Sequence, residues 1–174
     1  MIIYTLGHSN RPLPEFTDLL RAHAVTLLVD VRSIPRSRHN PQFNADTLPV
    51  SLGGMAIGWM HMKELGGLRK PRKDSVNTGW HNDSFRGYAD YMQTSEFELA
   101  LQRLIAISVL QPTAIMCAEA VPWRCHRSLI ADALTVRDIE VRHIMGPDKW
   151  QPHRLTPFAQ LEGITITYPF ALEG

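Results

Sequence analysis

The chain has 174 residues, of which 44% are hydrophobic and 20% charged, and its formal net charge is +1. This is the composition of an ordinary globular protein long enough to bury one core, and it argues against a disordered or low-complexity chain. A net charge so close to zero also argues against a protein that coats nucleic acid by charge alone.

The N-terminal residues and the number of cysteines indicate the cellular compartment in which we expect the protein. The opening residues, MIIYTLGHSN, lack the basic start, apolar run and cleavage site of a signal peptide, and no stretch approaches the roughly 18 to 20 apolar residues that cross a bilayer. We therefore expect a cytoplasmic protein without a membrane partner. In that compartment Cys117 and Cys125 are expected to be free thiols, ligands or redox groups rather than a structural disulfide.

Strand-like and helix-like patterns alternate along the chain. In chain order we expect a strand over 2–6, a helix over about 14–24, a strand over 26–31 buried on both faces, a strand over 57–62, a short helix over 85–92, a longer helix that opens at the capping box Ser95-Glu96-Phe97-Glu98, a strand over 113–117, a helix from about Cys125, a strand over 140–144 and a late edge strand over 164–168.

This alternation predicts an α/β fold: one domain over residues 1–174, with a mainly parallel, Rossmann-like sheet and helices on both faces. Residues 146–174 are expected to form a C-terminal extension that packs on the domain, and its segment WQPHRLTPFAQ to close over a pocket. In parallel sheets of this kind, ligands bind beyond the carboxyl ends of the strands.

Polar and reactive residues follow each predicted strand, so the topology is expected to bring them to one edge of the sheet. In strand order they are His8, Ser9 and Asn10, then Asp30, Arg32 and Arg36, then His61 and Glu64, and finally Cys117, Glu119, Arg124, Cys125, His126 and Arg127. This convergence predicts a single anion-binding pocket.

Cys125 opens a predicted helix between two arginines. A helix N-terminus attracts anions and lowers the pKa of a thiol there, so the site is either a thiolate or anion site or a buried cysteine beside a basic first turn. Cys117 ends an apolar run, where packing explains it. The loop from Cys117 to Arg124 has only a weak likeness to the phosphate-cradling loops of cysteine phosphatases and sulfurtransferases, because it spans six intervening residues without a glycine.

The same residues leave metal and redox chemistry open. The spacing from Cys117 to Cys125 fits no short zinc pair, so no structural metal is expected, and a catalytic metal held from several strands is the alternative. A thiol–disulfide pair is a further alternative, although the C-x-x-C signature is absent. The sequence specifies no cofactor.

Asp30 interrupts the apolar run TLLVDV, so it is either half of an ion pair with Arg32 or a general base, and Glu119 has the same two interpretations.

Two basic loops are each either a solvated face or a binding surface. Four aromatic residues are either core or stacking surfaces for a base. The loops contain Arg32, Arg36, Arg38 and His39, then Arg69, Lys70, Arg72 and Lys73; the aromatic residues are Trp59, Trp80, Phe85 and Tyr88.

The runs TLGHSN, LLVDVRSIPRSRHNPQF, ELGGLRKPRKDSVNTGW, SFRGYADYMQT and MCAEAVPWRCHRSLIADAL resemble the bacterial family called domain of unknown function 488. The resemblance extends from about Thr5 to about Ala159. It implies a compact α/β domain and an importance for these segments, and it brings no reaction, cofactor or substrate with it.

The residues therefore predict an enzyme, a hydrolase or transferase, that acts on a small phosphorylated or nucleotide-like anion. The predicted catalytic residues are Cys125, Asp30, His8, Glu119 and His126, and the predicted anion-binding residues are Arg32, Arg36, Arg124, Arg127, Ser9 and Asn10. The alternatives are a protein that binds nucleic acid through the basic loops, a thiol-redox or metal-dependent protein that uses Cys117 and Cys125, and a binding or regulatory module without catalysis.

Overall fold

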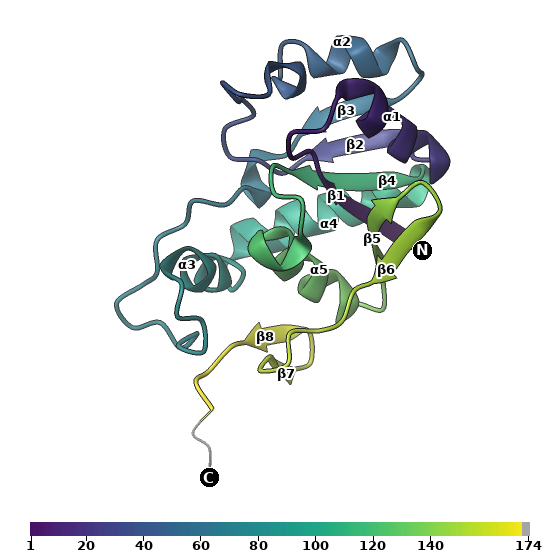
Figure 1. The fold of residues 1–174 in the computed structure, drawn as a ribbon. Coiled ribbons are helices and arrows are strands. Elements are labelled where there is room, and N and C mark those ends of the chain that lie inside the picture. Colours follow the sequence, from purple (N-terminus) through teal and green to yellow (C-terminus); the bar gives the residue numbers. More distant parts are fainter. Residues whose placement is uncertain (172–174) are drawn as a thin grey trace.

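A six-stranded sheet forms the centre of the computed structural model, which describes residues 1–171 (Figure 1). Its strands, in spatial order, are β3 (Gly58–His61), β2 (Leu27–Asp30), β4 (Thr113–Cys117), β1 (Ile2–Gly7), β5 (Glu140–Gly146) and β6 (Lys149–Pro152). The first five are parallel, and β6 runs antiparallel to β5. The fold is thus the α/β architecture that the sequence predicts.

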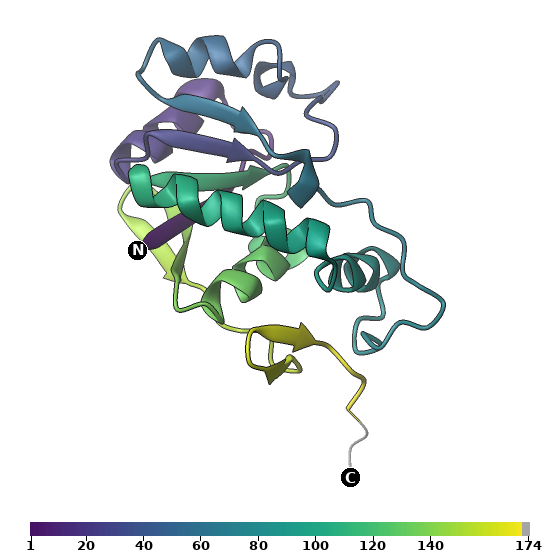
Figure 2. The ribbon, with the colours of Figure 1, turned by 180° about the vertical axis from the view of Figure 1, so that it is seen from behind.

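Helices cover both faces of the sheet, so the central strands β2 and β4 are buried throughout. Every residue of β2 and of β4 is buried, as expected of parallel strands between two helical layers. Helices α1 (Leu13–Ala22) and α2 (Leu48–Gly53) pack on one face through a core that includes Phe16, Phe43 and Leu52. The other face is covered by α3 (Asp83–Tyr91), α4 (Ser95–Leu110) and α5 (Arg127–Thr135), and Figure 2 shows α4 lying across it.

Two helix starts differ from their predicted positions. Thr94, not Ser95, caps α4: its Oγ1 accepts a hydrogen bond from the N–H of Phe97 over 3.3 Å. Helix α5 begins at Arg127 rather than at Cys125, because the single turn η3 (Pro122–Arg124) precedes it and leaves Cys125 in an extended conformation. Cys125 therefore lies just before the helix.

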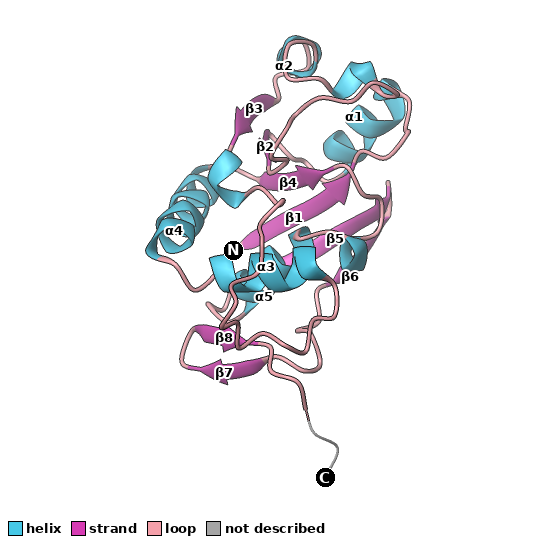
Figure 3. Cartoon of the chain, turned by 90° about the vertical axis from the view of Figure 1, so that its left-hand side faces the viewer, coloured by secondary structure: helices cyan, strands magenta, loops and turns pink. Residues whose placement is uncertain are grey.

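The C-terminal region holds the clearest error of the sequence prediction. The late edge strand expected over 164–168 is β8 (Thr165–Thr167), and it pairs with β7 (Gln160–Glu162) in a separate hairpin. The edge of the main sheet beside β5 is occupied by β6, which was not predicted. The hairpin lies against α5, away from the sheet (Figure 3), with Ile166 buried in the core.

None of the helices within residues 1–171 has both the length and the apolar character needed to cross a membrane.

Candidate active site

A pocket of about 810 Å³ opens at the carboxyl ends of β1, β2 and β4. The strands end level with one another, because Gly7 pairs with Cys117 and Asp30 with Met116. The ladder continues past the strand ends, since the N–H groups of His8 and Ser9 donate to the carbonyl oxygens of Cys117 and Ala118 over 3.0 and 2.9 Å. The first polar residues after each strand are thereby held side by side.

Gly7 allows the loop after β4 to fold over the end of β1. A Cβ atom at this position would lie 1.6 Å from the carbonyl oxygen of Glu119, a distance that no side chain can occupy. A glycine here is therefore required by the close approach of two backbones, and that approach places Glu119 and Ala120 on the pocket wall.

Two thiols lie on the buried side of the pocket. Cys117 ends β4 and Cys125 follows η3; both are buried, and neither is in a disulfide. The two thiols lie close enough for each to shift the pKa of the other. The backbone N–H of Arg127, at the start of α5, donates to Sγ of Cys125 over 3.4 Å, and Sγ of Cys117 lies 3.6 Å from the carbonyl oxygen of Glu119.

Arg127 brings a full positive charge beside these thiols. The residue is 1% exposed, and its Nη2 donates to the carbonyl oxygen of Ala120 over 3.3 Å. Its Nε and Nη1 atoms are buried without a hydrogen-bond partner, and no carboxylate within residues 1–171 forms an ion pair with it. A buried cation without a counter-ion is costly, so a negative charge is expected next to it.

The thiol pair is where that negative charge forms. Burial alone would raise the pKa of Cys117, but the hydrogen bond with Cys125, the charge of Arg127 and hydrogen bonding to the Glu119 backbone together lower this pKa below its ordinary value. Burial and the neighbouring Cys117 raise the pKa of Cys125 well above its ordinary value. Of the two thiols, Cys117 is therefore the one whose deprotonation this arrangement favours.

Asp30 and Arg32 form a buried, two-armed ion pair at the end of β2. Nε of Arg32 donates to Oδ1 of Asp30 over 2.9 Å and Nη2 to Oδ2 over 2.6 Å, while Nη2 also donates to the carbonyl oxygen of Phe43 over 2.6 Å. Asp30 is 0% exposed and lies behind the pocket wall, whereas Arg32 lines the pocket. Most of the Arg32 donors are already used, so this pair sets the shape of the wall.

His8 completes this chain of contacts. Its Nδ1 lies 2.7 Å from the carbonyl oxygen of Ser9, which assigns the proton to Nδ1, and its Nε2 lies 3.3 Å from Nη1 of Arg32. The ring stacks on Phe43. Burial and the nearby Arg32 charge lower the pKa of His8, so the ring is neutral and its Nε2 accepts the hydrogen bond from Nη1 of Arg32.

His126 is also held neutral. Its Nε2 donates to the carbonyl oxygen of Val31 over 2.9 Å, which leaves Nδ1 as an acceptor 3.6 Å from Sγ of Cys125. Burial is the main cause that lowers the pKa of His126 to about 4. The ring packs under Gly67, where a Cβ atom would lie 3.1 Å from Nδ1.

The exposed wall of the pocket carries charges without partners. Arg36 and Arg124 are exposed, line the pocket and form no salt bridge within the described residues. The exposed Glu119 also lines the pocket and forms no salt bridge there. With Arg32 neutralised by Asp30, these two arginines are the cations available to a ligand.

Two lining residues have strained backbones. Ser9 and Leu68 adopt left-handed conformations, with φ of 48° and 60°. For side chains other than glycine this costs about 1–3 kcal/mol and occurs most often at functional sites. The strain at Leu68 is held in place because Ser33 donates from Oγ to the carbonyl oxygen of Gly67 over 2.7 Å.

The pocket brings together most of the predicted site. His8, Ser9, Asn10, Arg32, Arg36, Glu119, Arg124, Cys125 and His126 line it, whereas Asp30 and Arg127 are buried behind its wall. His61 does not reach it, because its Nε2 hydrogen-bonds to the carbonyl oxygen of Arg32 over 2.7 Å. Glu64 lies in a separate hollow beside Arg69.

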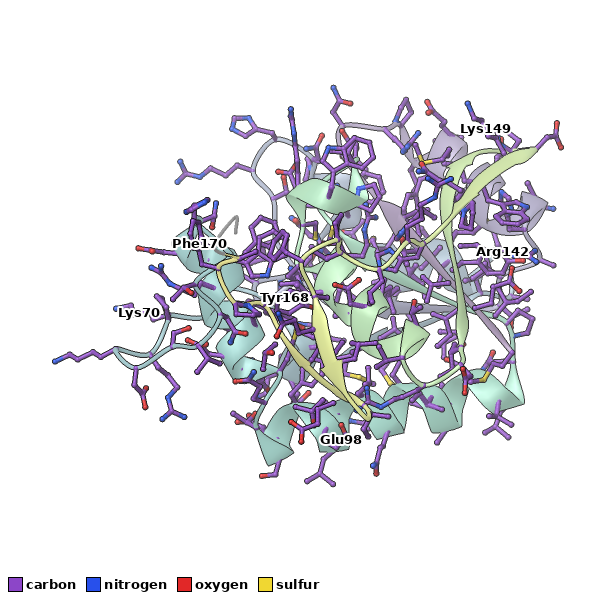
Figure 4. All side chains as sticks on the ribbon, turned by 90° about the horizontal axis from the view of Figure 1, so that it is seen from below. Lys70, Glu98, Arg142, Lys149, Tyr168 and Phe170 are labelled. Carbon is purple, nitrogen blue, oxygen red and sulfur yellow. The ribbon has the colours of Figure 1, made fainter. Side chains whose placement is uncertain are left out.

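The second basic loop and most of the aromatic residues lie elsewhere. The Arg69 guanidinium stacks 3.6 Å from the centre of the Tyr91 ring, and Arg72 pairs with Asp74. Lys70 lies at the outer edge of the molecule (Figure 4). Of the four aromatic residues considered as stacking surfaces, Phe85 alone lines the pocket.

The segment WQPHRLTPFAQ does not close over the pocket, contrary to expectation. Instead it is held to α5 by Asp132, which is 0% exposed. Asp132 accepts from Nε2 of His153 over 2.7 Å, from the hydroxyl of Thr156 over 2.7 Å and from that of Tyr168 over 2.8 Å (Tyr168 is labelled in Figure 4). Nδ1 of His153 in turn lies 2.9 Å from Nε2 of His143 on β5.

Sequence reasoning did not find several lining residues. Cys117 was expected at this edge of the sheet but was not named as catalytic, and no role was assigned to Ser33, Leu68, Asn82 or Ser84. Asn82 had a signal, since an Asn just before a helix is a typical cap, and its Oδ1 accepts from the N–H of Ser84 over 2.8 Å. Residues 1–171 contain no group of three His, Cys, Asp or Glu side chains arranged to hold a metal ion.

A family model described as "Domain of unknown function DUF488" matches residues 12–134. This range contains both thiols, Arg127 and the two exposed arginines of the pocket, Arg36 and Arg124. It is shorter at both ends than the range over which the sequence motifs resemble the family. No curated protein and no solved structure gives a match to the chain.

Proposed function

The chain belongs to the DUF488 family, and we propose that it is a thiol-dependent enzyme that binds a small anionic substrate in this pocket and attacks it with Cys117. The observation that carries the proposal is the buried Arg127, whose charge has no carboxylate partner within the described residues and lies beside two thiols. A thiolate is the counter-ion that this arrangement favours, and a thiolate is the reactive form of cysteine.

The other pocket residues have separate roles in this proposal. Cys125 keeps its proton and donates to the Cys117 sulfur, which orients the nucleophile. Arg36 and Arg124 bind the anionic group of the substrate, because arginine is suited to two-armed contacts with phosphate or carboxylate. As the Cys117 sulfur bonds to the substrate, the bond to the leaving group breaks and the leaving group departs with its electron pair. Neutral His8, whose Nε2 then exchanges its Arg32 partner for a water, accepts a proton from that water as it hydrolyses the covalent intermediate.

The sequence-based assignment of the nucleophile changes with this proposal. Cys125 was predicted to be catalytic because it opens a predicted helix, and the helix does donate an N–H to it. Cys117 takes the role instead, since it is the thiol whose pKa is lowered, and it lies at the carboxyl end of a central strand beside the arginine wall.

The test is protection of Cys117 against iodoacetamide by inorganic phosphate, read at peptide level by mass spectrometry. We expect Cys117 to be alkylated faster than Cys125 at neutral pH, and phosphate to slow it. Arg36→Ala and Arg124→Ala should each weaken that protection. Arg38→Ala is the matched control, because Arg38 is exposed in the same loop but does not line the pocket. Equal protection in all three variants would remove the anion site from the proposal.

The contact between the two thiols also favours a second candidate, a thiol-redox protein. A hydroperoxide would oxidise the Cys117 thiolate to a sulfenic acid, and the Cys125 thiol would then displace water to form a disulfide. Treatment with hydrogen peroxide followed by mass spectrometry distinguishes the two candidates. Loss of two hydrogen atoms per chain, reversed by dithiothreitol, supports the redox function, whereas stepwise oxidation of Cys117 without a disulfide contradicts it.

A further inference from the structure

The pocket has an apolar side as well as a basic one. Ile34 and Leu68 are 64% and 77% exposed, yet both line the pocket, together with Phe85. They come from three separate segments: the loop after β2, the loop after η2 (Lys63–Leu65) and the first turn of α3. We call these three residues the apolar lip. A bare inorganic anion would make no use of it.

Two residues of the lip are held by local packing. Leu68 has a left-handed backbone conformation and follows two closely packed glycines: a Cβ atom at Gly66 would lie 2.5 Å from Oγ of Ser33. Phe85 is fixed by an aromatic stack, since its ring lies 5.0 Å from that of Trp80 at 20°, and Phe158 meets Trp80 edge-on at 4.8 Å. An exposed leucine in a strained conformation and a ring stacked on a second aromatic residue are features of a surface suited to contact.

The size of the pocket agrees with a ligand larger than an oxyanion. About 810 Å³ lies within the range of sites that enclose a drug-sized molecule. Such sites combine apolar and aromatic walls with a few placed polar groups. Here Arg36 and Arg124 supply charge from the β2 and β4 loops, while the lip supplies a flat apolar surface.

We infer that the substrate is an anion that carries a flat aromatic or heterocyclic ring, with its charged group at Arg36 and Arg124 and its ring against Leu68 and Phe85. This inference rests on the proposed function and specifies its substrate class. Ring stacking on a fixed aromatic side chain adds about tenfold to affinity, so the ring should be detectable above the contribution of the charge.

The experiment compares four probes as protectants of Cys117 against iodoacetamide: inorganic phosphate, ribose 5-phosphate, adenosine and adenosine monophosphate. We expect adenosine monophosphate to half-protect at a concentration about tenfold lower than ribose 5-phosphate does. Leu68→Asn should remove most of that advantage and leave protection by phosphate unchanged, because asparagine tolerates the left-handed backbone but offers no apolar surface. Leu161→Asn, on the exposed hairpin strand β7, is the matched control.

The outcomes separate this inference from the proposed function. If phosphate protects but adenosine monophosphate is no better than ribose 5-phosphate, the inference is overturned and the anion site stands. Adenosine protecting as well as its monophosphate would also overturn it, since the charge would then contribute nothing. If none of the four probes protects Cys117, both the inference and the anion site are overturned. Circular dichroism and thermal unfolding of the Leu68 variant show whether it retains the fold.

Discussion

The ion pair of Asp30 and Arg32 shows how a single carboxylate shapes this pocket. Asp30 is fully buried in a strand with apolar neighbours, and it is neutralised by two side-chain hydrogen bonds from Arg32 and a third from the Arg32 backbone. The sequence left two interpretations open, an ion pair and a general base. The geometry favours the ion pair, because no oxygen of Asp30 lies at the pocket surface.

Removing the Asp30 charge should therefore act on stability. Asp30→Asn leaves Arg32 buried without its counter-ion, and breaking a buried pair in this way costs about 3–5 kcal/mol of unfolding free energy. Asp74→Asn is the control, because it breaks an aspartate–arginine pair of the same i,i+2 spacing at an exposed position and should change stability little. Urea unfolding of both variants measures the difference, and similar free energies of unfolding would contradict it.

At the scale of elements, the site depends on how the loop after β4 crosses the end of β1. Hydrogen bonds from His8 and Ser9 fix this loop, and the absence of a side chain at Gly7 lets it approach. The crossing holds Cys117, Glu119 and Ala120 in the pocket wall. The two thiols come into contact because η3 returns the chain to the end of β4.

Gly7→Ala tests that crossing. The new methyl group would meet the Glu119 carbonyl oxygen, so the loop must shift, which lowers the free energy of unfolding by about 1–3 kcal/mol or more. Iodoacetamide should then no longer react faster with Cys117 than with Cys125. Gly53→Ala is the matched control, since nothing lies within 4 Å of a Cβ atom there and alanine is favoured in helix α2. Two variants with the same stability and the same alkylation pattern would show that the close approach is unimportant.

The positions of most helices and strands were predictable from the sequence, but the contacts between them were predictable only in part. The alternation of apolar runs and helical spacing was enough to predict the parallel sheet, and the rule for strand ends placed His8, Arg36 and Arg124 in one pocket. Cys117 was expected at the strand ends, but packing and a functional role could not be distinguished, because an apolar strand end looks the same whether its last side chain packs or faces a cavity. The β7–β8 hairpin was misplaced because alternation indicates a strand without naming its partner.

At the scale of the whole molecule, buried polar groups join the sheet to the C-terminal segment. Thr5 on β1, His143 on β5, His153 and Asp132 on α5 form one hydrogen-bonded chain with contacts of 2.6, 2.9 and 2.7 Å. Burial and the neighbouring His153 lower the pKa of His143 to about 3. The folded protein thus contains at least two histidines, His143 and His126, that stay neutral at pH values where an unfolded chain protonates them.

Stability should therefore fall as pH decreases below 6.5, the ordinary pKa of histidine. The unfolded chain takes up protons there and the folded chain does not until the pH nears 4 at His126, so each such histidine removes up to about 1.4 kcal/mol per pH unit. Urea unfolding between about pH 7 and pH 5, above most carboxylate titration, measures the slope. His126→Gln should flatten it, and His39→Gln, at an exposed position, should not. Equal slopes in the two variants would contradict the prediction.

The most direct test of the central claim is the pH dependence of Cys117 alkylation in the wild type and in Arg127→Met. Arg137→Met is the control, because Arg137 follows α5 and already has Glu98 as its partner. We expect the midpoint of alkylation to lie below about 8.5, the pKa of a free thiol, in the wild type and the control, and at or above that value in Arg127→Met. If the midpoint does not move when Arg127 is replaced, or if Cys117 reacts only after unfolding, the thiolate at the centre of this site does not exist.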